Sequence, residues 1–178
     1  MRLTRWLAPP HLAVAAGLAQ AWSIADPWTG QPHGWLQILS LSWLMWRLAQ
    51  GAGRSASWRA STWVSPERGA AWRRALWPAW LFAVVWLAGT FWWLFISMHT
   101  YGGLNAALAA AAVLALAGFL ALYYAAAGAA FVALAPAQVL FGHPVRSALA
   151  FAACWTLAEL ARGQWLTGFP WGAGGYAH

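Results

Sequence analysis

Charged residues are scarce in this chain, and lysine is absent. The 178 residues include ten arginines and three acidic residues, so charged residues make up only 7% of the sequence. A soluble domain uses about a quarter of its residues as charges to cover its surface. Hydrophobic residues account for 62%, and the mean hydropathy is +0.55. This composition excludes an ordinary soluble domain and predicts an integral membrane protein.

Cysteine is nearly absent as well, because Cys154 is the only one. A single cysteine excludes an internal disulfide and a metal site built from several thiolates. The neighbours of Cys154 are apolar, which suppresses thiolate formation, so we interpret it as a packing residue. The five histidines are scattered along the sequence, and we therefore expect no metal site and no cofactor.

The arginines are distributed unevenly. The first nine fall at the N-terminus, in and around the polar segment 49–74, and in a later connection that ends at Arg146. These three places lie on the same side of the membrane if the chain crosses the bilayer twice between one and the next. The positive-inside rule then predicts a cytoplasmic N-terminus and a cytoplasmic Arg-rich loop over residues 49–74. We do not expect a nucleic-acid partner.

The apolar runs predict an all-α fold, a polytopic transmembrane helix bundle with about five spans. A spanning helix needs about 20 apolar residues. The second run is short, since its 14 residues cover only about 21 Å of a hydrocarbon core of about 30 Å. It must extend towards Ala52, thin the bilayer, or fail to cross completely. The expected spans are residues 7–25, 35–48, 75–98, 104–134 and 147–166.

Two of these spans carry packing signals. Trp86 lies in the middle of the third span, away from the interfaces that tryptophan favours, so we expect it to pack against protein. The fourth span is rich in alanine and contains Gly118 and Gly128. Small residues let helix backbones approach closely in lipid, which predicts a close neighbour for this helix.

The last predicted span contains a polar pair, Glu159 and Arg162. Residues three apart share one helix face and can form an ion pair or a hydrogen bond. An ionisable group within a membrane span is a functional-site hypothesis by default. The alternative is a structural clasp that neutralises both charges near the outer interface.

An aromatic loop follows this span. Gly168 permits unusual backbone angles, Pro170 stiffens the turn, and Phe169 and Trp171 place amphipathic rings at the depth of lipid headgroups. Such a loop can guide a lipid tail or simply anchor the helix end. His99 and Tyr101, in the turn predicted for residues 99–103, lie on the same predicted side of the membrane.

Two segments resemble a known family. The sequences FWWLFISMHTYGG and ELARGQWLTGFPWGAGGYAH, with the alanine-rich helix between them, resemble the membrane domain of bacterial apolipoprotein N-acyltransferase. The resemblance runs from about Trp77 to His178. It implies that residues 1–178 are the N-terminal transmembrane domain, a fragment of an inner-membrane enzyme about three times longer.

The resemblance also implies a reaction. Such enzymes transfer an acyl chain from a phospholipid to the N-terminal amine of a diacylglyceryl-cysteine lipoprotein. Their catalytic Glu, Lys and Cys belong to a nitrilase-like domain, so no residue of this chain is expected to be catalytic. We expect Glu159, Arg162, Phe169, Trp171, His99 and Tyr101 to support substrate binding or lipid access.

A different class of function is also consistent with the residues alone. The chain would then be a non-catalytic integral membrane scaffold or assembly protein, complete at 178 residues. The two hypotheses differ in whether the native reading frame continues beyond His178 into a long polar domain that contains Glu, Lys and Cys.

Overall fold

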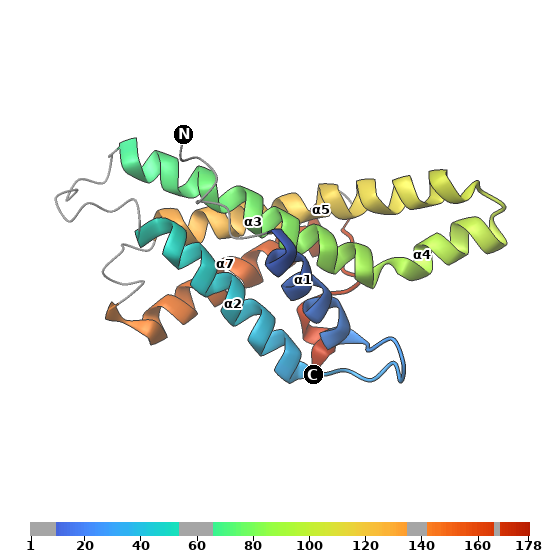
Figure 1. The fold of residues 1–178 in the computed structure, drawn as a ribbon, viewed down its shortest axis with the longest axis horizontal. Helices are drawn as coiled ribbons and strands as arrows, with labels where there is room; N and C mark the ends of the chain where they lie inside the picture. The colour runs from blue at the N-terminus through green and yellow to red at the C-terminus, as the bar shows by residue number, and fades with distance from the viewer. Residues whose placement is uncertain (1–9, 54–65, 135–141, 166–167) are drawn as a thin grey trace.

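The computed structural model describes residues 10–53, 66–134, 142–165 and 168–178, and these segments are almost entirely helical (Figure 1). No strand occurs in these ranges, so the all-α prediction is confirmed. The helices are α1 (Pro10–Ile24), α2 (Gly34–Gly53), α3 (Pro66–Thr90), α4 (Trp92–Ile96), α5 (Ala106–Leu134) and α7 (Pro144–Gln164). A π-helix, η1 (Ser97–Tyr101), continues α4, and a 3₁₀ turn, η2 (Gly174–Ala177), precedes the C-terminus.

Helix α3 lies at the centre of the bundle. It forms the largest helix–helix interface with α5 and also packs against α1 and α2. Trp86 of α3 is completely buried. Its ring lies 4.9 Å from that of Tyr124 on α5 and 6.0 Å from that of Trp155 on α7. The expectation that Trp86 packs against protein is therefore confirmed.

The close approach predicted for the alanine-rich helix occurs at Gly128. A Cβ atom on Gly128 would lie 2.8 Å from the Cβ of Ala79 on α3 and 3.3 Å from Cδ1 of Leu48 on α2. Gly118 is less tightly packed, since its added Cβ would lie 3.6 Å from the Trp80 ring. The Gly118 carbonyl accepts the Trp80 indole N–H at 3.0 Å. Small residues thus fix the distance between α3 and α5, as expected in lipid.

These two glycines give a matched test of the α3–α5 packing. We expect Gly128→Ala to lower the thermal unfolding midpoint in detergent, because overpacking a close contact costs typically about 1–3 kcal/mol. Gly118→Ala should leave the midpoint unchanged or raise it, because replacing a helical Gly with Ala gains up to about 1 kcal/mol. Equal midpoints for the two variants would contradict the close approach at Gly128.

The observed helix boundaries bear on two expectations. Helix α2 has 20 residues and spans about 30 Å at 1.5 Å per residue, so of the three alternatives left open for this run the structure shows the extension towards Ala52. The predicted loop over residues 49–74 is wrong at both ends, because α2 continues to Gly53 and α3 begins at Pro66. Proline is favoured in the first turn of a helix, and alanine and arginine are good helix formers. Residues 54–65 lie outside the described part of the chain.

The span predicted for residues 75–98 is not one straight helix. The axes of 71–90 and 92–101 differ by 52°, with the break at Phe91. The Thr90 hydroxyl donates to the carbonyl of Trp86 at 2.9 Å, a type of bond that bends helices. Helix η1 then includes most of the turn predicted for residues 99–103, and only Gly102 to Asn105 are non-helical.

One described helix, α5, is long and apolar enough to cross a membrane, and the bent pair around Phe91 passes only if its two parts count as one span. The structure therefore does not confirm five spans. Helices α2 and α7 are long enough, but polar residues interrupt them, among them Gln37 and Arg47 on α2 and Glu159 and Arg162 on α7.

The connection between α1 and α2 is organised by Asp26. Its carboxylate accepts the hydroxyl of Thr29 and the backbone N–H groups of Trp28 and Thr29, the latter two at 2.9 and 2.7 Å. The His33 ring lies 3.2 Å from the same carboxylate. The Thr29 hydroxyl, followed by the backbone N–H of Thr29, holds the pKa of Asp26 well below its usual range.

The lowered pKa of Asp26 makes this connection sensitive to acid. A depressed carboxylate pKa adds stability that is fully present above the unfolded value of about 3.9 and is lost as the pH falls through the folded pKa. We therefore expect Asp26→Ala to lower the thermal midpoint at pH 7 and the deficit to shrink progressively at acidic pH. A deficit that does not change between pH 7 and pH 3 would show that the charge of Asp26 is irrelevant.

Candidate functional site: the C-terminal clasp

Glu159 and Arg162 lie on the last turns of α7, on the face that meets the C-terminal segment. Their spacing allows an ion pair or a hydrogen bond between them, but within the described ranges no salt bridge joins the two side chains. Each binds the backbone of the C-terminal segment instead. Both oxygens of Glu159 accept the N–H of Gly174, at 3.0 and 3.2 Å, and Arg162 Nη1 donates to the carbonyl of Trp171 at 2.8 Å.

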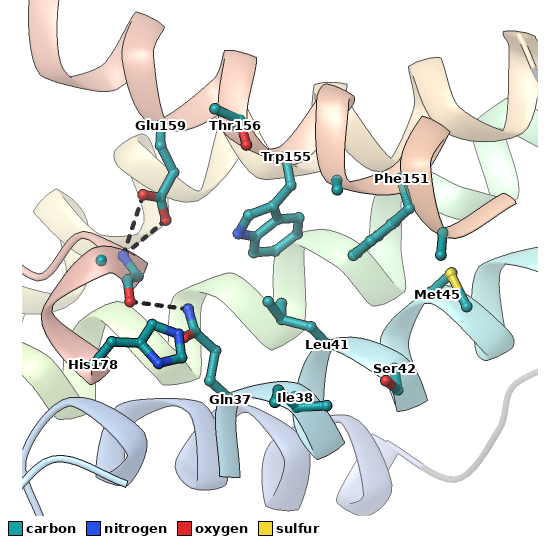
Figure 2. Close-up of a pocket in the computed structure, with 14 residues that line it drawn as sticks. Gln37, Ile38, Leu41, Ser42, Met45, Phe151, Trp155, Thr156, Glu159 and His178 are labelled. Atoms are coloured by element: carbon teal, nitrogen blue, oxygen red, sulfur yellow. Dashed lines mark hydrogen bonds between the residues drawn. The ribbon is translucent and has the colours of Figure 1, made fainter. Parts of the chain in front are cut away.

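The peptide groups of Gly174 are held from two sides (Figure 2). While Glu159 binds the N–H, the carbonyl of Gly174 accepts Nε2 of Gln37 on α2 at 3.0 Å. A Cβ atom here would lie 2.4 Å from Nε2 of Gln37 and 3.2 Å from Oε1 of Glu159, so a larger residue would displace the two side chains that bind this backbone. We call Gln37, Glu159, Arg162, Trp171 and Gly174 the C-terminal clasp.

A buried polar chain continues from the clasp into α1. Ser40 lies one turn after Gln37 on α2, and its hydroxyl donates to Oε1 of Gln20 at 2.5 Å. Gln20, Ser40 and Gln37 are all buried. Polar side chains in so apolar a bundle are most stable when they bond each other, so this chain fixes α1, α2 and η2 relative to α7.

Arg162 is the most unusual member of the clasp. It is 1% exposed, and its guanidinium carbon lies 5.8 Å from the centre of the Tyr124 ring. Its Nε and Nη2 atoms make no hydrogen bond that meets normal geometry among the described residues. Burying a cation costs several kcal/mol unless other groups compensate for the lost hydration. The Tyr124 ring, the Trp171 carbonyl and the nearby carboxylate of Glu159 offset part of that cost.

The loop after α7 rests on the bend between α3 and α4. Gly168 and Gly172 both have φ of +71°, which lets the chain reverse twice within five residues. Phe169 makes an edge contact with Phe91, at 5.2 Å between ring centres, and Trp171 contacts Trp93 at 6.1 Å. The loop therefore touches both sides of the bend.

Gly172 offers a test of this contact. A Cβ atom there would lie 2.5 Å from Cγ2 of Thr90, and the positive φ disfavours any other residue. We expect Gly172→Ala to destabilise the loop by about 1–3 kcal/mol and to increase its cleavage by protease in detergent. Gly175→Ala is the matched control, since nothing lies within 4 Å of its added Cβ. Equal cleavage of the two variants would contradict the contact.

The structure separates the six predicted site residues into two groups. Glu159, Arg162, Phe169 and Trp171 gather around the clasp. His99 and Tyr101 lie on η1, at the far end of the hairpin formed by α4 and the start of α5, well away from the C-terminal loop (Figure 1). His99 Nδ1 is 2.8 Å from the carbonyl of Leu104, and Tyr101 is 84% exposed.

Sequence reasoning missed several residues of this region. Gln37, Ser40 and Gln20 were assigned only to helical spans, and Tyr124 was not singled out. A signal existed, because glutamine inside apolar helices of a chain with 7% charge is costly and needs a partner. No pattern in the sequence pairs Gln37 with a backbone group 137 positions away.

In the described residues this protein is an all-helical bundle with one long apolar helix and a buried polar clasp. Comparison with known proteins specifies it further. The family model of the apolipoprotein N-acyltransferase N-terminal domain matches residues 16–178. The chain therefore belongs to the apolipoprotein N-acyltransferase family, by its N-terminal domain, and the resemblance seen in the sequence is confirmed.

Individual relatives agree with this assignment. The chain is 56% identical over 166 residues to the apolipoprotein N-acyltransferase of Verminephrobacter eiseniae, which covers 93% of this chain and 27% of the relative. It is 41% identical over 170 residues to that of Ralstonia nicotianae, covering 94% and 29%, respectively. For Pseudomonas putida the identity is 34% over 183 residues, covering 97% and 30%. The chain thus spans less than a third of the length of these relatives.

Proposed function

We propose that this chain is the membrane portion of an enzyme that transfers an acyl chain from a phospholipid to the N-terminal amine of a diacylglyceryl-cysteine lipoprotein. The family match over residues 16–178 is the observation that carries the proposal. The names of the relatives specify acyl transfer to the amine of an apolipoprotein. The catalytic groups would lie in the part of the longer protein that follows this domain.

The proposal includes a multi-pass arrangement in the bacterial inner membrane, with the N-terminus and the Arg-rich segment 49–74 in the cytoplasm. Helix α5 supports the membrane setting, because only 28% of its most apolar window is buried within the protein. Large apolar side chains also remain exposed on the other helices, for example Ile38 on α2 and Leu149 on α7. A lipid environment would cover these surfaces without further protein contacts.

The clasp suggests how this domain would serve the reaction. Gln37 and Glu159 hold Gly174, and Arg162 holds the carbonyl of Trp171. The indole of Trp171 remains 57% exposed although its backbone is fixed. A rigidly held aromatic ring at headgroup depth is suited to contact a lipid that approaches the active site. The exposed ring of Tyr101 on η1 would meet lipid at a second place.

Trp171→Ala in the full-length protein tests this role. The exposed indole contributes little to folding, so we expect unchanged abundance in the membrane. Loss of one aromatic contact of about 1 kcal/mol corresponds to roughly a fivefold lower rate of acyl transfer. The measurement is acylation of a diacylglyceryl lipopeptide in membranes that contain equal amounts of each variant.

Trp28→Ala is the matched control for this experiment. Trp28 is also exposed, at 79%, and like Trp171 it contacts one other tryptophan ring. Its acyl transfer should equal that of the unmodified protein. Equal rates for Trp171→Ala and Trp28→Ala would remove the lipid-access role. Absence of acyl transfer in the unmodified full-length protein would favour a non-catalytic membrane scaffold instead.

A further inference from the structure

Arginine is concentrated at one end of the helix bundle. The structure describes the side chains of five arginines, and four of them lie in the last turns of α2 or the first turns of α3 and α7: Arg47, Arg73, Arg74 and Arg146. The two acidic side chains that it describes lie elsewhere. Asp26 precedes α2, and Glu159 is thirteen positions after Arg146 on α7, about 20 Å at helical rise.

The contact at Gly128 brings the arginine-bearing parts of α2 and α3 together. A Cβ atom on Gly128 of α5 would lie 3.3 Å from Cδ1 of Leu48 on α2 and 3.9 Å from the carbonyl oxygen of Ala75 on α3. Arg47 directly precedes Leu48, and Arg74 directly precedes Ala75. The two arginines therefore belong to the same level of the bundle.

Helix α7 begins at the same end. The ring of Phe151 on α7 lies 5.3 Å from that of Phe131, which is three residues beyond Gly128 on α5. Arg146 is five residues before Phe151, so it lies farther out towards the end of the bundle, and it is exposed. Figure 1 shows the C-terminus of α2 and the N-termini of α3 and α7 on the left of the bundle, opposite the hairpin of α4.

Tryptophan accompanies the arginines. The guanidinium carbon of Arg73 lies 5.4 Å from the centre of the Trp72 ring, and Arg73 and Arg74 are exposed. Trp46 on α2 and Trp77, one turn after Arg73 on α3, are 53% and 52% exposed. Tryptophan favours the boundary between lipid and water. These rings therefore place the arginines at the depth of lipid headgroups.

Charge and aromatic rings together indicate the ligand. Residues 66–74 of α3 contain one acidic residue, Glu67, and three arginines. Positive charge close to a membrane surface attracts anionic phospholipids, by about fivefold for each arginine. An acidic protein or a nucleic acid would also be attracted by the charge, but it would leave the exposed tryptophans in water. A lipid covers the rings with its chains and meets the arginines with its headgroup.

We propose that the end of the bundle formed by α2, α3 and α7 binds phospholipids with a negatively charged headgroup, and that Arg73, Arg74 and Arg146 attract that headgroup. In the arrangement proposed above, these lipids belong to the cytoplasmic leaflet. The inference rests on the proposed membrane setting, and it is independent of the proposed reaction.

Lipid binding to the full-length protein in detergent tests the inference. Purified protein is mixed with equal amounts of phosphatidylglycerol and phosphatidylcholine, and the bound lipids are counted by native mass spectrometry. Both lipids carry the same ether-linked chains, which cannot be transferred, so the result does not depend on the proposed reaction. The test variant combines Arg73→Gln with Arg146→Gln. The matched control combines Arg73→Lys with Arg146→Lys, which keeps the positive charge.

The unmodified protein should bind about tenfold more phosphatidylglycerol than phosphatidylcholine. The glutamine variant should lower this ratio by about fivefold or more, and the lysine variant should keep it within about twofold. Binding of phosphatidylcholine should be equal in all three proteins, because it needs the apolar surface but not the arginine charges.

Equal binding of both lipids by the unmodified protein, an unchanged preference in the glutamine variant, or joint loss of both lipids from that variant would each overturn the inference. Displacement of phosphatidylglycerol by soluble glycerol phosphate at the same concentration would also overturn it, because the site would then bind free phosphate rather than a lipid surface. A protein that stays in solution without detergent would contradict the membrane setting as well.

Discussion

The hydrogen bonds to Gly174 are the constraint on which the arrangement of this domain depends. Two side chains from different helices, Gln37 and Glu159, bind the two polar groups of one glycine. Because α2 and α7 hardly touch directly, this backbone group connects them. Residues 168–174 are held close to α7 as a result, and the rings of Phe169 and Trp171 rest on the bend after α3.

Hydrogen bonding of polar side chains to backbone groups also explains why few charged residues are enough to fix the irregular segments. The chain has three acidic residues, and two of them, Asp26 and Glu159, bind backbone N–H groups. Asp26 organises the turn before α2, and Glu159 holds η2. Arg162 similarly binds a carbonyl rather than a carboxylate. In this apolar bundle these polar side chains hold irregular backbone in place.

Composition and the apolar runs were sufficient to predict the helical class, the approximate ends of most helices and a close neighbour for the alanine-rich helix that contains Gly118 and Gly128. They placed Trp86 in the core because no interface was near it. They did not predict the bend after Thr90. The hydrogen bond from the Thr90 hydroxyl to the Trp86 carbonyl depends on local geometry and leaves no signal in the hydropathy. They allowed a direct Glu159–Arg162 ion pair or hydrogen bond, but could not identify the backbone groups that these side chains bind instead. The backbone groups that compete for these side chains come from a loop whose position depends on tertiary packing.

The bend also makes the tip of the hairpin, formed by α4, η1 and the start of α5, sensitive to small changes in the angle. The ten residues from Trp92 to Tyr101 extend about 15 Å at helical rise, so a bend of 52° carries the far end sideways by about 12 Å. At that length, a change of about 10° in the angle moves Tyr101 by between about 2 and 3 Å. The bend is the place where Gly172 meets Thr90 and Phe91. A small change in packing under the loop would therefore produce a larger displacement at the tip of the hairpin.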